Sequence, residues 1–153
     1  PRLQDMVGAV CMALNFKLLM LRGVEYNNVY TFGGNGSQNF GIVNVYTGTP
    51  YYPYYVYIMV GPNLGKNDLI IESSSSSSDI SVIAWLHNET LNILLINKVN
   101  ETRKVALSQV AGESSLWKID NNSPSLQTGI VGASESITMN GYTVMLLQTK
   151  ASL

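Results

Sequence analysis

Short runs of alternating apolar and polar residues fill the second half of the chain and constrain its fold more than any other feature. They follow residue 66, and turn-forming residues separate them. Alternation with a period of two places the apolar side chains on one face of a strand. The pattern predicts an antiparallel β-sandwich over residues 66–153, with strands in the runs DLIIES, ISVIAWLH, LNILLIN, TRKVALS, SSLWKID, ESITM and YTVMLLQT.

Two of these runs indicate which residues share a face. In the third run Leu91, Ile93 and Leu95 lie two positions apart, and so do Tyr142, Val144 and Leu146 in the last. Six consecutive serines, at positions 73–78, separate the first run from the second, and we interpret them as a loop between strands. We expect this half to fold by itself, because its strands can pair with one another.

The first 65 residues have a different pattern. Apolar residues recur at helical spacing over residues 3–21 and predict a helix that Gly23 ends. They cover more than one face of this helix, so we expect it to be buried against a different chain or a missing segment. The next stretch, residues 23–32, is rich in β-forming residues and predicts a short strand. After a Gly-rich loop and an extended segment, a tyrosine-rich run predicts a second helix over residues 52–60. One strand between two helices cannot complete a parallel sheet, so these elements need strands and helices from elsewhere.

The composition of the 153-residue chain narrows the class of partner. Charged residues make up 12% of the sequence, and nine basic and ten acidic side chains leave a formal net charge of -1. No basic stripe is available to neutralise a phosphate backbone, so we expect no nucleic-acid partner. Solubility has to come mainly from Ser, Thr and Asn, which favours an extracellular location. The longest apolar stretch, residues 7–21, is too short to span a bilayer, and we expect no membrane span.

The rarest residue types exclude two kinds of site. The single cysteine, Cys11, cannot form an intramolecular disulfide, and its apolar surroundings predict burial. The single histidine, His87, precedes a turn, where we expect it to be solvated. One histidine excludes a histidine-based metal cluster, and we expect neither a metal nor a cofactor.

The order of the segments resembles the C-terminal part of retaining glycoside hydrolases in which a β-sandwich follows a catalytic (β/α)8 barrel, as in the arabinofuranosidase and xylosidase-like families. ISVIAWLHNETLNILLINKVNETRKVALS and SITMNGYTVMLLQT are similar to strands of that sandwich. GVEYNNVYTFGG resembles the eighth barrel strand, and TPYYPYYVYIMVG the helix after it. The resemblance implies an α+β fold, with the last strand and helices of the barrel in residues 1–65 and a β-sandwich accessory domain in residues 66–153.

The resemblance also implies what this segment contributes to catalysis. The two catalytic carboxylates of the family follow the fourth and seventh barrel strands, which this segment does not include, so no catalytic residue is expected here. Glu25 is the only acid near the expected strand, but it lies at the N-terminal end, whereas barrel chemistry takes place at the C-terminal ends. The resemblance instead implies the wall of a sugar site, with Tyr30 and Phe32 at the end of the strand and Asn35 and Gln38 on the next loop.

The implied function is that of a C-terminal subunit or fragment of a glycoside hydrolase. It would act on an oligo- or polysaccharide, together with a chain or segment that carries the rest of the barrel. One alternative is a non-catalytic extracellular carbohydrate-binding or surface module that shares only the all-β pattern. Another is a filament subunit whose sheet a neighbouring copy completes. A barrel fragment must have an exposed apolar helix, and an independent module needs none.

Overall fold

The computed structural model describes residues 4–25, 27–28, 31–34, 41–108, 110, 112–132 and 136–151. Its helices are α1 (Met6–Leu21), α2 (Tyr52–Val60) and the single 3-10 turn η1 (Gly61–Asn63). Its strands are β1 (Gly33–Gly34), β2 (Val43–Asn44), β3 (Leu69–Ile71), β4 (Ile80–His87), β5 (Thr90–Asn97), β6 (Arg103–Val105), β7 (Ser114–Asp120), β8 (Ser123–Val131), β9 (Ile137–Met139) and β10 (Val144–Lys150).

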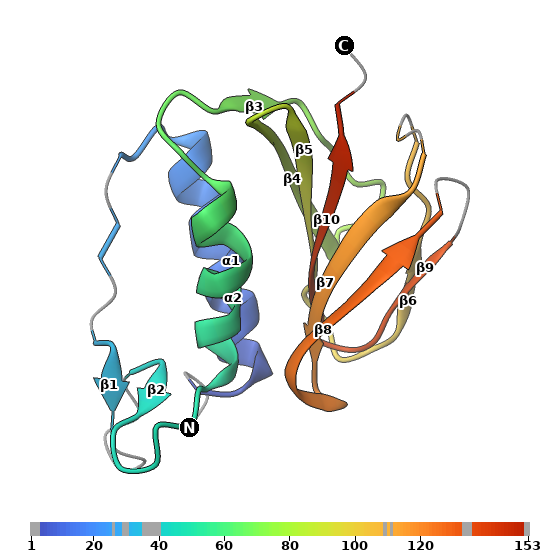
Figure 1. Cartoon of the computed structure of the whole chain (residues 1–153). Helices are drawn as coiled ribbons and strands as arrows, with labels where there is room; N and C mark the ends of the chain where they lie inside the picture. The colour runs from blue at the N-terminus through green and yellow to red at the C-terminus, as the bar shows by residue number, and fades with distance from the viewer. Residues whose placement is uncertain are drawn as a thin grey trace.

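A six-stranded sheet forms the centre of the molecule. Its strand order is β3-β4-β5-β10-β7-β8, and all neighbouring strands are antiparallel. The helices α1 and α2 cover one face of this sheet, and the antiparallel ribbon β6-β9 lies over the other face (Figure 1). The short parallel pair β1-β2 lies on the far side of the helices from the sheet (Figure 1). The fold is therefore mixed α+β, with a mostly antiparallel sheet and two helices.

Each of the seven alternating runs contains a strand, as predicted, but the sequence analysis missed β8. The sequence of β8, SPSLQTGIV, combines proline, glycine and polar residues and does not alternate. It pairs along β7 from Ser114 opposite Val131 to Asp120 opposite Ser123. The extended conformation of β8 thus depends on its neighbour more than on its own residues.

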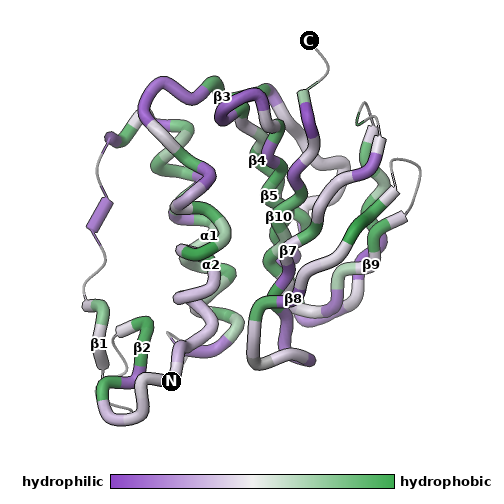
Figure 2. The backbone as a smooth tube through the Cα atoms, viewed as in Figure 1, coloured by the Kyte–Doolittle hydropathy of each residue, from purple (hydrophilic) through white to green (hydrophobic). Residues whose placement is uncertain are grey.

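Alternation along β5 separates two hydrophobic clusters on opposite faces of the sheet. Ile93 and Leu95 are buried toward the ribbon, with Leu91 packed beside them, which confirms the predicted shared face. Leu94 and Ile96 are buried toward the helices. Figure 2 shows hydrophobic backbone along much of β4, β5 and β10, as expected for central strands that are covered on both faces.

The two helices pack on each other and on the sheet. Asp5 caps α1, because its Oδ1 accepts a hydrogen bond from the backbone N–H of Gly8 at 3.1 Å. The rings of Phe16 and Tyr57 join α1 to α2 edge to face, with centroids 4.9 Å apart. The second helix has the predicted bounds, Tyr52–Val60. Under the helix pair lie Val144 and Leu146, which the alternation placed on one face.

The expected strand over residues 23–32 needs correction. Its described residues belong to no strand, and pairing begins only at Gly33. A parallel strand takes its hydrogen bonds from strands on either side. Among the described residues, the segment after residue 32 pairs with β2, and this pairing is only two residues long.

The burial expected of Cys11 on α1 needs correction. The small residues Ala9 and Ala13 are fully buried, while Cys11 is exposed, and Leu18 and Leu21 are 56% and 55% exposed. Met6, Val10 and Phe16 are buried with these alanines, so the packed face of α1 holds both small and large side chains. Leu18 and Leu21 lie on surface that the described residues leave largely uncovered.

Candidate functional site

The β1-β2 pair holds the one expected sugar-site residue that the structure describes, Phe32. The carbonyl of Phe32 accepts hydrogen bonds from the backbone N–H groups of Ile42 and Val43, each at 3.0 Å. The N–H of Val45 donates to the carbonyl of Gly34 at 3.1 Å. These bonds fix the backbone on both sides of the pair and place Phe32 at its start.

Glycines allow the two segments to approach this closely. Gly41 has a φ of +101°, and a Cβ there would lie 2.4 Å from the backbone nitrogen of Gly34. A Cβ on Gly33 would lie 2.4 Å from Cγ1 of Val45. The Gly-rich composition of this region therefore serves close backbone packing.

A turn after β2 presents further side chains to solvent. The Oδ1 of Asn44 accepts hydrogen bonds from the N–H groups of Tyr46 at 3.0 Å and Thr47 at 3.3 Å, which is the pattern of an Asx turn. Tyr46 is 79% exposed, Phe32 is 64% exposed and Val45 is 57% exposed. We call Phe32, Val45 and Tyr46 the β1-β2 surface.

The structure describes only part of the sugar site expected from the sequence. Phe32 is exposed at the start of the β1-β2 pair, where a ligand can reach it. Tyr30, Asn35 and Gln38 lie outside the described residues. Tyr46 was missed, and the signal that identifies it is the turn sequence NVYTG, in which an asparagine precedes an exposed aromatic residue.

The β1-β2 surface is exposed and apolar, and it has no acid for hydrolysis. No Asp or Glu occurs between residues 26 and 67, and Glu25 is exposed after the C-terminal end of α1. Hydrolysis of a glycosidic bond needs two carboxyl groups, one as acid and one as nucleophile or base. An aromatic and apolar surface without carboxylates can hold a sugar ring by packing but cannot cleave it.

A hollow of about 490 Å³ lies beside the end of α1, and Glu25, Lys66 and Asp68 are among the residues that line it. Next to it, Nδ1 of His87 lies 2.8 Å from Oδ1 of Asp68, whose Oδ2 accepts a hydrogen bond from the N–H of Gly65 at 2.7 Å. His87 was expected to be solvated, but only 21% of its side chain is exposed, and Asp68 holds it between the start of β3 and the β4-β5 turn. We interpret this contact as structural, because it ties the loop before β3 to the sheet.

Two further findings concern the described residues only. None of their His, Cys, Asp and Glu side chains form a group that could hold a metal ion. The helices in this part of the chain are too short or too polar to cross a membrane.

Comparison with solved structures finds a consistent set of neighbours. The chain is 19% identical to a glycoside hydrolase family 30 subfamily 8 xylanase, Xyn30A, from Clostridium acetobutylicum, with a TM-score of 0.68 over 97% of this chain and 40% of that one. It is 15% identical to a family 44 xyloglucanase from Paenibacillus polymyxa, with a TM-score of 0.68 over 96% of this chain and 30% of that one. It is 10% identical to an α-L-arabinofuranosidase from Thermotoga maritima, with a TM-score of 0.66 over 96% of this chain and 39% of that one.

The sequence matches no protein-family model and no curated protein. At these low identities the similarity to solved structures establishes the fold alone. The fold is one that occurs within glycoside hydrolases, and the chain spans well under half of each of these three enzymes.

Proposed function

We propose that this chain is the C-terminal part of a glycoside hydrolase and completes a catalytic (β/α)8 barrel whose other strands, and both catalytic carboxylates, belong to another chain or segment. The observation that carries the proposal is the coverage, since the chain aligns over 97% of its length with a xylanase but accounts for only 40% of that enzyme. Residues 1–65 would supply the barrel piece, and residues 66–153 the accessory sandwich.

The exposed side of the helix layer supports this role. Leu18 and Leu21 of α1 are 56% and 55% exposed, and Val24, three residues beyond the helix, is 46% exposed. Apolar area contributes about 25 cal/mol per Å² when it is buried, so these exposed apolar side chains favour a covering partner. The other helices and strands of a barrel would be such a cover.

The β1-β2 surface would then form one wall of the sugar site, with Phe32 as the residue that both the sequence and the structure support. Tyr30, Asn35 and Gln38 remain proposed members of this wall. Because the similar enzymes are a xylanase, a xyloglucanase and an arabinofuranosidase, we propose an oligo- or polysaccharide as the substrate of the completed enzyme. The polar, weakly charged composition supports an extracellular location.

The test compares the isolated 153-residue chain with the natural protein that contains it, purified through an affinity tag. Both are assayed on nitrophenyl xylosides, arabinofuranosides and glucosides. We expect the natural protein to be larger than 16.7 kDa and active, and the isolated chain to be inactive. Turnover by the rigorously purified chain alone, or a natural protein that hydrolyses no glycoside, contradicts the proposal. In the second case, binding of xylan by the isolated chain would favour a carbohydrate-binding module.

Single substitutions in the natural protein test the wall. Phe32→Ala and Tyr46→Ala should each lower kcat/KM by on the order of 10- to 100-fold, because a displaced substrate reacts more slowly. Ile130→Ala is the matched control, since Ile130 is 71% exposed but lies on β8, an edge strand of the six-stranded sheet that is not part of the β1-β2 surface. Unchanged kinetics in both aromatic variants would remove these residues from the site.

A further inference from the structure

The sequence Asn-Glu-Thr occurs on both sides of the strand β5, and the function proposed above uses neither copy. The first copy covers residues 88–90, at the turn between β4 and β5, and the second covers residues 100–102, between β5 and β6. An asparagine that is followed by any residue except proline and then by Ser or Thr is an acceptor for an N-linked glycan. Such triplets also arise by chance, so the surroundings of each asparagine decide whether it can carry a glycan.

Asn88 lies at the tip of the β4-β5 hairpin. Asn88 and Glu89 are both exposed and have φ values of +46° and +64°. Positive φ at both central residues is typical of a tight type I′ turn, which ends the hairpin in solvent. Nδ2 of Asn88 lies 2.9 Å from Nε2 of His87, and this contact uses one of its two amide hydrogens. The other hydrogen is available for replacement by a sugar.

Asn100 lies on a turn whose backbone is fixed by the neighbouring loop. The N–H of Tyr142 donates to the carbonyl of Val99 at 2.8 Å, and a Cβ on Gly141 would lie 2.4 Å from the carbonyl oxygen of Asn100. Asn100 and Thr102 are exposed, and no hydrogen bond joins the side chain of Asn100 to another described residue. The turn therefore presents a free carboxamide to solvent.

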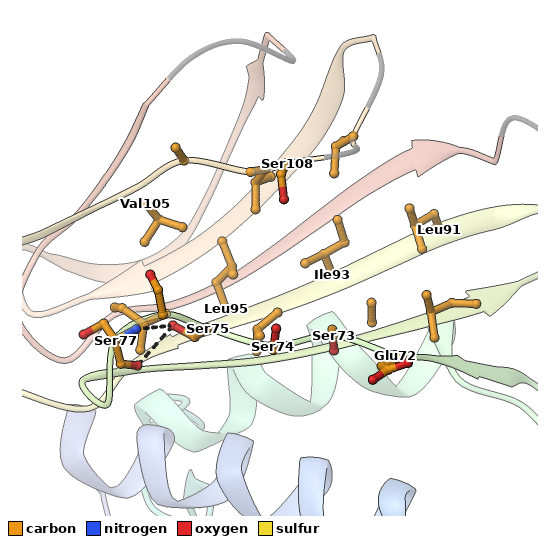
Figure 3. A pocket seen from close by; sticks show the side chains of 18 of the residues that line it. Glu72, Ser73, Ser74, Ser75, Ser77, Leu91, Ile93, Leu95, Val105 and Ser108 are labelled. Carbon is orange, nitrogen blue, oxygen red and sulfur yellow. Dashed lines mark hydrogen bonds between the residues drawn. The ribbon is translucent and has the colours of Figure 1, made fainter.

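The strand between the two triplets offers no acceptor. Leu91, Ile93 and Leu95 line a cleft of about 520 Å³ on one face of the sheet (Figure 3). Asn92 and Asn97 are fully buried, and Nδ2 of each donates hydrogen bonds to backbone carbonyls. Neither of these asparagines belongs to an acceptor triplet. The asparagines that the core needs are thus separate from those that are free to be modified.

Two further triplets are less suited to this role or cannot be judged. Asn121 is exposed, but the hydroxyl of Ser123 in its triplet donates to the carbonyl of Ser125 at 3.0 Å. Pro124 follows that serine directly and restricts its backbone. The triplet that begins at Asn35 lies outside the described residues.

We propose that Asn88 and Asn100 carry N-linked glycans. Only their access to a glycosylating compartment rests on the extracellular location proposed above. In the transfer, Nδ2 forms a bond to C1 of an oligosaccharide and loses one proton, while the bond from C1 to the diphosphate of a lipid carrier breaks and the lipid diphosphate leaves. One N–H stays on Nδ2, so the contact between Asn88 and His87 is retained. Since charged residues make up only 12% of the sequence, glycans at both ends of β5 add hydration that the side chains supply weakly.

Peptide mass spectrometry of the natural protein, purified from its own host, tests both sites. Trypsin separates them, because Asn88 lies in the peptide of residues 67–98 and Asn100 in that of residues 99–103. We expect sugar on both peptides, located by fragmentation at Asn88 and Asn100, and none on the buried Asn92 and Asn97. An unmodified peptide removes that site, and two unmodified peptides overturn the inference, even if the natural protein hydrolyses glycosides. Glycans on a protein that hydrolyses no glycoside support the inference and count only against the enzyme proposal.

Substitutions at the third position of each triplet test how the sugar is attached. Thr90→Ala and Thr102→Ala keep the asparagine but remove the hydroxyl group that the acceptor sequence requires. Each variant, expressed in the natural host, should lose the mass of one glycan and keep its circular dichroism spectrum. Thr138→Ala is the matched control and should lose no glycan, since Thr138 is an exposed threonine of β9 outside any acceptor triplet. An unchanged glycan mass in both Thr90→Ala and Thr102→Ala means that the sugar is attached elsewhere and overturns the inference.

Discussion

Asp120 is the most constrained charged residue in the described part of the chain. Its carboxylate is fully buried at the end of β7. Oδ2 lies 3.1 Å from Nζ of Lys118 and accepts a hydrogen bond from Asn140 at 3.0 Å, and Oδ1 accepts one from the N–H of Asn122 at 2.9 Å. Burial by itself raises the pKa of Asp120, but the hydrogen bonds and the charge of Lys118 outweigh burial and hold the pKa below its ordinary value of 3.8.

We predict that Asp120 makes the stability of the protein depend on pH. Its pKa is lower in the folded than in the unfolded chain, so the unfolded chain binds more protons in acid. The contribution of Asp120 is therefore complete above pH 3.8 and is lost as the pH falls through the folded pKa. Asp120→Asn should cost about 1.5–3 kcal/mol of unfolding free energy at pH 7 and flatten the loss of stability in acid. Urea denaturation at several pH values measures both effects.

Asp79→Asn is the control for this prediction. Asp79 pairs with Arg103, but both side chains are about one-third exposed. A pair of this kind contributes about 0–1 kcal/mol, so the variant should stay close to the wild type at pH 7. If the two variants lose equal stability, burial and hydrogen bonding do not distinguish Asp120.

At the level of elements, α1 has two different faces. One is buried and includes Ala9, Ala13 and Phe16, whose ring contacts Tyr57 of α2, and the other exposes Leu18 and Leu21. The helix is thus apolar on more than one side, as the sequence indicated, but this chain covers only one side. Its position depends on its packing, and its first turn depends on Asp5.

We predict that Asp5→Ala lowers the unfolding free energy by about 1 kcal/mol. The substitution removes the side chain that accepts a hydrogen bond from Gly8 and leaves that N–H without its partner. Thermal unfolding followed by circular dichroism measures the loss. Asp5→Asn keeps an accepting oxygen and should lose only a few tenths of a kcal/mol. If Asp5→Ala is as stable as the wild type, the hydrogen bond from Gly8 to Asp5 does not stabilise the helix.

For the whole molecule, the helices and the sheet share one core and one polar network. The indole N–H of Trp85 donates to the carbonyl of Asn63, at the end of the helix layer. Nε2 of Gln148 donates to Oδ1 of Asn63 and to Oδ1 of Asn92, each at 2.9 Å. These bonds and the buried cluster under the helices cross the proposed domain boundary between residues 65 and 66.

These contacts revise what we expect of residues 66–153 expressed alone. The truncated chain uncovers the helix face of the sheet, including Trp85, Leu94 and Leu146, which are fully buried in the whole chain. We predict that it keeps β-structure by far-ultraviolet circular dichroism, melts at a lower temperature and binds a hydrophobic dye. Residues 1–65 added in trans should reduce dye binding. Cooperative melting at the temperature of the whole chain, without dye binding, would instead support the independent folding expected from the pattern of strands.

The sequence by itself determined the features that depend on local pattern. The period-two runs located β4, β5 and β10 and divided β5 correctly between two faces, because side-chain direction in a strand follows from position alone. Helical spacing located α1, and Pro53 in a first turn, with Gly61 and Pro62 after the tyrosine-rich run, located α2. The position of Phe32 after a β-rich stretch, and the resemblance that accompanied it, identified a residue that is exposed on the β1-β2 surface.

Only the tertiary structure decided which segments meet. β8 has no strand pattern of its own and forms along β7. His87 is held by Asp68, which lies 19 positions away in the sequence. Tyr46 projects from a turn that depends on hydrogen bonds to Asn44. Within the described residues, one layer of the sandwich has six strands and the other has two. Each of these features is a contact or a missing contact between distant segments, and periodicity along a chain carries no information about which distant segment will be the neighbour.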